Sequence, residues 1–114
     1  MVELTLQVSN SLAQQIQPIS NWLPTIIELS VANFKSSHVK KAADKLVAFL
    51  SSNPTPQKVL KHKIANESQN RVSSLLEKNG DGTINSDENK ELDEWQKFNN
   101  ICFHLSAQTL KLTK

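Results

Sequence analysis

The sequence predicts a mainly α-helical protein with one short N-terminal β-strand, followed by five or six helices. Residues 2–8 alternate between apolar and polar side chains, which is the period of a half-buried strand. After residue 10, apolar residues recur every three or four positions, which is the spacing of an amphipathic helix. With 114 residues, the chain is expected to form one domain, or one small core with an appended element.

The expected strand raises the question of its partner. Its apolar face holds Val2, Leu4, Leu6 and Val8. A single strand leaves its backbone N–H and C=O groups unpaired, and the rest of the sequence offers no second strand. We therefore expect the same strand of a second copy to pair with it, so that Leu4 and Leu6 lie in a homodimer interface.

Three helices are expected in the first half of the chain. Ser9-Asn10 is a good N-cap for a helix over 10–19, which Pro18 limits. A second helix over 24–34 and a third over 37–51 follow. The breaker Asn53-Pro54-Thr55-Pro56 then divides the chain into a dimerisation region, 1–53, and a C-terminal helical region, 54–114.

The C-terminal region is expected to contain three helices. Thr55 caps a short helix that begins at Pro56, and a second helix covers 66–78. A sharp turn at 79–84 holds both glycines, and a long helix over 86–110 ends the chain. Trp95 and Phe98 lie on the apolar stripe of this last helix, where they serve either the core or a partner interface.

The charge of the chain is unevenly distributed. The formal net charge is +2, but residues 1–63 carry seven Lys and three acids, whereas residues 64–114 carry six Lys or Arg and eight acids. This asymmetry suits an anionic partner at the basic end. The alternative is that two helical faces are simply solvated differently.

The composition also indicates where the protein works. A single cysteine, Cys102, cannot form an intrachain disulfide, which fits a reducing compartment. The first residues lack the pattern of a signal peptide, and no apolar run is long enough to span a membrane. We therefore expect a cytoplasmic protein.

The order strand, helix, helix at the N-terminus resembles the ribbon-helix-helix fold. In that family two chains pair their strands into a ribbon that reads bases in the DNA major groove. The resemblance implies that Thr5 and Gln7 face DNA bases, and that Asn21 and Thr25 face phosphate near the start of the second helix. The alternative is a strand that only dimerises, because no Lys or Arg precedes Lys35.

Residues 77–88 resemble the twelve-residue EF-hand loop, and also a dockerin repeat. Calcium prefers six to eight hard oxygen ligands around a tight turn that glycine permits. In this resemblance Gly82 is the turn glycine, and Glu77 replaces the usual Asp at position one. The implied ligands are Asn79, Asp81, Thr83, Asn85 and Glu88. The alternative is a helix end followed by a capping box, in which Asn85 and Glu88 exchange hydrogen bonds.

Several short segments resemble a group of small cyanobacterial-type proteins that look antitoxin-like or regulatory. The matching pieces are Leu4–Val8, Phe49–Pro56, Leu75–Asn79, Gly82–Ile84 and Glu91–Trp95. The resemblance implies a cognate protein partner, such as a toxin or a nuclease.

Residues that could catalyse a reaction do not form a recognisable set. Cys102 and His104 are two apart on the last expected helix, so they point to different faces, and His38 and His62 lack zinc-site spacing. We therefore expect a non-enzymatic regulatory binding protein without a cofactor, which acts through a partner protein. If the resemblance to the ribbon-helix-helix fold holds, the protein also binds DNA. The alternatives are a calcium-binding protein, or a protein-protein adaptor that uses the long helix over 86–110.

Overall fold

The computed structural model describes residues 3, 5–62 and 66–113. Within these residues the chain forms six α-helices and one short 3₁₀-helix, and it contains no β-strand. The prediction of a mainly helical protein is therefore confirmed. The elements are α1 (Asn10–Ile16), η1 (Gln17–Ile19), α2 (Leu23–Ala32), α3 (Ser37–Ser51), α4 (Pro56–Lys61), α5 (Asn66–Asp81) and α6 (Ser86–Leu112).

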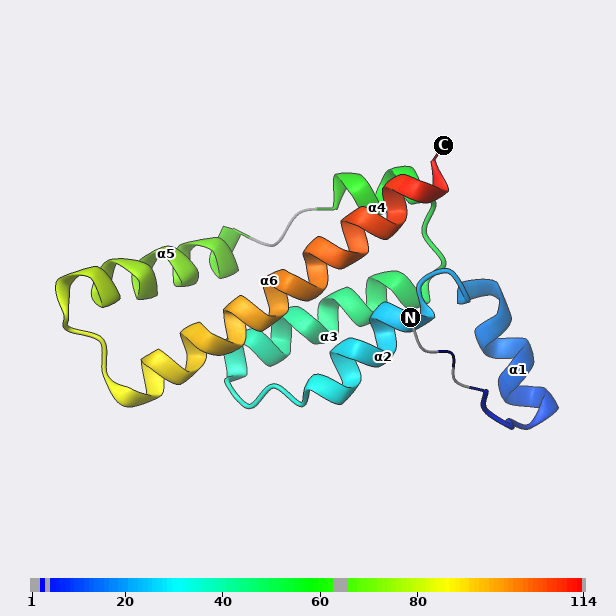
Figure 1. Ribbon diagram of the computed structural model, residues 1–114, viewed down its shortest axis with the longest axis horizontal. Helices are drawn as coiled ribbons and strands as arrows, with labels where there is room; N and C mark the ends of the chain where they lie inside the picture. Colours follow the sequence, from blue (N-terminus) through cyan, green and yellow to red (C-terminus); the bar gives the residue numbers. More distant parts are fainter. Residues whose placement is uncertain (1–2, 4, 63–65, 114) are drawn as a thin grey trace.

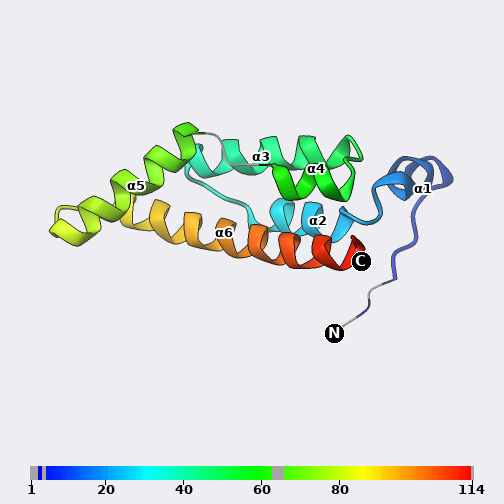
Figure 2. The same ribbon diagram turned by 90° about the horizontal axis from the view of Figure 1, so that it is seen from above.

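The long helix α6 is the element on which the other helices assemble. Helices α2, α3, α4 and α5 all pack against it, and α2 and α5 also contact α3 (Figure 1). Helix α5 lies beside the first part of α6, at the end of the molecule opposite to α1 (Figures 1 and 2). The molecule is elongated as a result, with extents of 52 × 30 × 26 Å.

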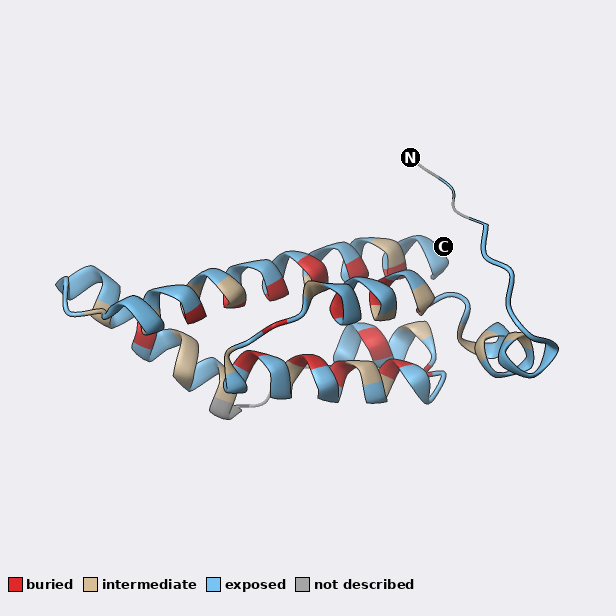
Figure 3. Cartoon of the chain, turned by 90° about the horizontal axis from the view of Figure 1, so that it is seen from below, coloured by how far each residue is buried: buried red, intermediate tan, exposed pale blue. Residues whose placement is uncertain are grey.

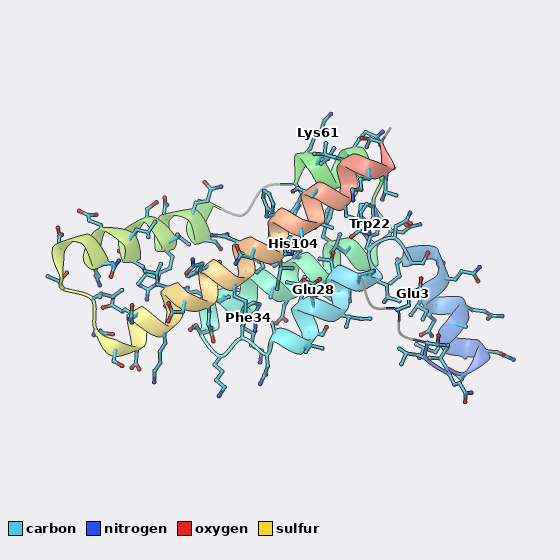
Figure 4. The ribbon with its side chains drawn as sticks, in the orientation of Figure 1. Glu3, Trp22, Glu28, Phe34, Lys61 and His104 are labelled. Atoms are coloured by element: carbon cyan, nitrogen blue, oxygen red, sulfur yellow. The ribbon has the colours of Figure 1, made fainter. Side chains whose placement is uncertain are left out.

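The core lies where the inner faces of α2, α3, α4 and α6 meet (Figure 3). It draws on both sides of the breaker at Pro54, since Leu50 and Val59 are both buried. Trp22 and Phe34, labelled in Figure 4, flank α2 and are both buried. The Trp22 indole donates a hydrogen bond to the Pro54 carbonyl oxygen over 3.1 Å, which ties the start of α2 to the connection between α3 and α4.

The predicted N-terminal strand is not formed within the single chain over the residues that the structure describes. Glu3 and residues 5–9 are neither strand nor helix, and all of them are exposed. Val2 and Leu4, which belong to the same prediction, lie outside the described residues. The physical reason is that a strand needs a neighbouring strand for its backbone hydrogen bonds, and a single chain supplies none here.

The predicted helices over 37–51 and from Pro56 are confirmed, and the others differ at their ends. Pro18 converts the last turn of the helix expected over 10–19 into η1. The helix expected over 24–34 ends two residues early because Asn33 adopts a left-handed conformation, with φ of 52°. Helix α6 runs to Leu112 rather than 110.

The link between α5 and α6 is built from two caps. Helix α5 extends past residue 78 to Asp81, and Gly82 then takes a left-handed φ of 71°. The Thr83 N–H donates to the Lys78 carbonyl over 2.9 Å, and the Gly82 N–H donates to the Asn79 carbonyl over 3.3 Å, which is a Schellman motif. Asn85 and Glu88 then form the predicted capping box at the start of α6.

The two glycines in this link predict opposite effects of the same substitution. Gly82→Ala is expected to lower the free energy of unfolding by about 1 kcal/mol, because a Cβ disfavours the left-handed conformation. Gly80→Ala is expected to raise it by about 0.5–1 kcal/mol, because Gly80 lies within α5 and a Cβ there would meet no neighbouring atom. Urea denaturation followed by circular dichroism measures both changes, and changes of equal sign would contradict the Schellman assignment.

Candidate functional site

The N-terminal arm, residues 5–19, is the part of the chain that is least integrated into the fold. It comprises an extended segment, α1 and η1, and it projects beyond one end of the helical body (Figures 1 and 2). None of its residues is buried. Ser9 caps α1 by accepting a hydrogen bond from the Leu12 N–H over 3.2 Å, so the start of the helix is defined locally.

The arm nevertheless carries apolar side chains that face solvent. Leu6 is 72% exposed, and Val8 and Leu12 are also exposed. A seven-residue helix is marginal by itself in water, since helix formation needs more residues to offset its nucleation cost. The apolar side chains of the arm therefore contribute nothing to the buried core of the single chain.

Helix α2 adds a second exposed apolar surface next to the arm in sequence. Its buried side holds Thr25 and Leu29, whereas Ile27 and Val31 lie one helical turn apart on the opposite side. Val31 is 76% exposed. These two side chains and those of the arm belong to the elements that the sequence assigned to the dimerisation region.

The residues expected to contact DNA do not form one surface. Thr5 and Gln7 are exposed on the arm. Asn21 is also exposed, and its backbone carbonyl accepts a hydrogen bond from the Gln108 side-chain amide over 2.9 Å. Thr25 is buried on the inner side of α2, where it is 4% exposed, so this conformation keeps it from reaching phosphate.

The residues expected to bind calcium lie partly in α5, partly in the link that follows it, and partly in α6. Asn79 and Asp81 lie in the last turn of α5, where successive side chains point to different sides. Thr83 and Asn85 lie in the link to α6. An EF-hand loop would instead wrap these residues around one point. Within the described chain, no group of three or more His, Cys, Asp or Glu residues is arranged to hold a metal ion.

Glu88, the bidentate ligand of the calcium hypothesis, already has two partners. Its Oε2 accepts from Lys78 Nζ over 2.5 Å, and its Oε1 accepts from the Asn85 N–H over 3.2 Å. The Lys78 ammonium and then the Asn85 backbone lower the pKa of Glu88. The carboxylate therefore caps α6 and links it to α5.

Trp95 and Phe98, expected at a partner interface, are buried in the single chain. They are 1% and 2% exposed, and their rings pack edge to face with centroids 5.8 Å apart. The Trp95 indole donates to Glu91 Oε2 over 3.0 Å. These two residues therefore belong to the core that holds α6 against its neighbours.

Glu91 is a buried carboxylate that joins α5 to α6. Arg71 donates two hydrogen bonds to it, from Nε over 2.9 Å and from a terminal guanidinium nitrogen over 2.8 Å. These bonds lower the pKa of Glu91 and outweigh burial, which acts in the opposite direction. One signal for this pair is visible in the sequence, because Glu91 lies four residues before Trp95 on the apolar stripe of α6.

Glu94 joins α6 to the connection between α2 and α3. Its carboxylate accepts from the backbone N–H groups of Lys35 and Ser36 over 3.0 and 2.9 Å. Burial acts to raise the pKa of Glu94, but these two N–H groups outweigh it and the pKa is lowered. The negative charge of Glu94 at this place also interacts favourably with the positive end of the α3 dipole.

Cys102 and His104 point to different sides of α6, as the spacing predicts. Cys102 is partly buried, and burial raises the pKa of its thiol to about 11. His104 is exposed next to Phe103. The thiol is therefore protonated at neutral pH, and this pair does not form an activated nucleophile.

Comparisons of the chain with protein-family models, with curated proteins and with solved structures give no match. None of the helices that the structure describes is long and apolar enough to cross a membrane.

Replacement of Glu91 predicts a pH-dependent loss of stability. Glu91→Gln keeps an acceptor for the Trp95 indole but removes the charge that Arg71 faces. Breaking a buried ion pair costs about 3–5 kcal/mol. Because the Arg71 side chain is 30% exposed, water compensates part of this cost, and we expect a loss of about 2 kcal/mol at neutral pH.

The sign of the pH dependence follows from the lowered pKa of Glu91. The contribution of Glu91 to the free energy of unfolding is fully present above the ordinary pKa of 4.5. It disappears as the pH falls through the lower pKa of the folded state. The difference in unfolding free energy between the native protein and Glu91→Gln should therefore shrink below about pH 4.5. Asp93→Asn, at an exposed neighbouring position, is the matched control. A difference that stayed constant with pH would contradict this role of the Arg71–Glu91 pair.

Proposed function

We propose that the protein is a non-enzymatic, antitoxin-like regulatory binding protein that acts through partner proteins, with the N-terminal arm as its docking element. The observation that carries this proposal is that the arm combines exposed apolar side chains with no buried residue, whereas the body has a buried core as well as exposed apolar side chains. The core formed by α2, α3, α4, α5 and α6 is complete without the arm, yet the arm exposes Leu6, Val8 and Leu12 to solvent. Burial of an apolar side chain of this size stabilises a complex by about 1.5–3 kcal/mol.

The first partner that we propose is a second copy of the chain. A two-fold dimer uses the same surface on both subunits, so each apolar residue of that surface is buried on both chains. The alternation of apolar and polar side chains over residues 2–8 gives this segment one apolar face for packing against its own copy. Ile27 and Val31 of α2 extend the apolar surface available to such a dimer.

DNA contact is the second candidate function, and one observation favours it. Thr5 and Gln7 are exposed on the arm, where a paired ribbon would present their side chains to base edges. Phosphate contact would then have to come from exposed lysines such as Lys40 and Lys45 on α3. A titration with duplex DNA at two salt concentrations tests this candidate, because phosphate contacts weaken steeply as salt is added.

A charge introduced on the apolar side of the arm is expected to dissociate the dimer. Leu6→Lys removes two buried leucines per dimer and places two ammonium groups at the interface, so we expect the dissociation constant to rise about a hundredfold or more. Light scattering of the purified chain across a concentration series measures this change. Circular dichroism should show that the helices are retained, because residue 6 is outside the core.

Gln7→Lys is the matched control, since it adds the same charge at the adjacent exposed position on the polar side of the arm. We expect it to remain a dimer. A native protein that is monomeric at all concentrations, or equal behaviour of both variants, would overturn the self-association proposal. The same measurement with and without millimolar calcium separates the remaining alternative, because a mass that changed only with calcium would transfer the role to residues 77–88.

A further inference from the structure

A cavity of about 310 Å³ lies between α3, α4, α6 and the first turns of α5. Its floor is apolar and is formed mainly by Leu46, Phe49, Val59, Phe98 and Leu105. The His62 ring stacks on Phe49 with centroids 4.2 Å apart and makes one wall. Lys45, His62 and Ser106 are exposed, so the cavity opens to solvent where they lie.

A second cavity of about 390 Å³ continues from the first between α3 and α5. The two share Ala42, Lys45 and Ser68 in their linings, so they form one groove with two ends. The second end is polar and basic, and it is lined by His38, Lys41, Lys45 and Arg71. Among the residues whose side chains the structure describes, none that lines either end is acidic.

The charges at the basic end are only partly compensated. Arg71 is paired with Glu91. The ion pairs among the described residues leave Lys41 and Lys45 without an acidic partner. These two lysines are one helical turn apart on α3, so both can face one anionic group.

From this groove we infer a binding site for a single-chain amphipathic anion, with a medium-length alkyl chain in the apolar end and a carboxylate at Lys41 and Lys45. The cavity volume sets the chain length. The apolar end is roughly twice the ~150 Å³ that accommodates benzene, which corresponds to a chain of roughly ten carbons. A site with an apolar body and a few polar groups at one end is the usual form of a small-molecule pocket.

The groove is separate from the proposed docking surface. None of its lining residues belongs to the N-terminal arm, and neither Ile27 nor Val31 contributes to it. Ligand binding at the groove can therefore be tested independently of the docking role proposed for the arm.

Decanoate is the probe that tests this inference, with decanol as the uncharged molecule of equal chain length. Calorimetry measures both affinities, and the rate of Cys102 alkylation reports occupancy because Cys102 lines the apolar end. We expect decanoate to bind more tightly than decanol and to slow the alkylation. Absence of protection at Cys102, or equal binding of the two probes, would overturn the assignment.

Two pairs of variants locate the ligand within the groove. Ser106→Trp places a large ring at the opening of the apolar end and should weaken decanoate binding tenfold or more, whereas Ala107→Trp, at an exposed neighbouring position, should leave it unchanged. The double variant Lys41→Ala/Lys45→Ala should weaken decanoate about fivefold and leave decanol unaffected.

Lys40→Ala is the control for the double variant, because Lys40 is exposed on the same helix and does not line the groove. We expect it to bind decanoate with the native affinity. The lysine variants alter exposed positions, so they test the site even if Ser106→Trp disturbs the fold. Decanoate binding that is indifferent to both Ser106→Trp and the double lysine variant would place the ligand elsewhere and overturn the inference.

Discussion

The buried stripe of α6 is the contact on which the other helices depend. Trp95, Phe98, Ile101 and Leu105 repeat at helical spacing, and α2, α3, α4 and α5 all pack against this one helix. A helix of 27 residues offers enough length for partners on different stretches of one stripe. The short helices gain their stability from this packing, because a six-residue helix such as α4 is not stable alone.

Polar side chains of α6 then set where the connections lie. Glu88 caps its own helix and reaches Lys78, Glu91 holds Arg71, and Glu94 holds the backbone between α2 and α3. Each carboxylate has its hydrogen-bond partners, and the described chain has no buried side-chain nitrogen or oxygen without one. Acidic residues that could suggest a cation site therefore hold helices together.

The helices were largely predictable from the sequence, because spacing and caps are local properties. Thr55-Pro56 and the Asn85–Glu88 box mark helix starts that the structure reproduces. The strand at 2–8 was not predictable in the same way, since alternation indicates a face but not the partner that a strand requires. The burial of Trp95 and Phe98, and the groove along α3, depend on how distant segments meet, which no local pattern records.

The chain thus separates a self-contained helical body from an arm that has no support of its own. The apolar groove lies within the body, where Lys45 links its two ends, while the exposed apolar residues Leu6 and Leu12 lie on the arm. Apolar side chains on an unsupported element gain nothing from the fold, whereas in a complex their burial is favourable. Our proposal that the body presents the arm to another chain rests on this difference, since the core includes no residue of the arm although the arm carries exposed apolar side chains.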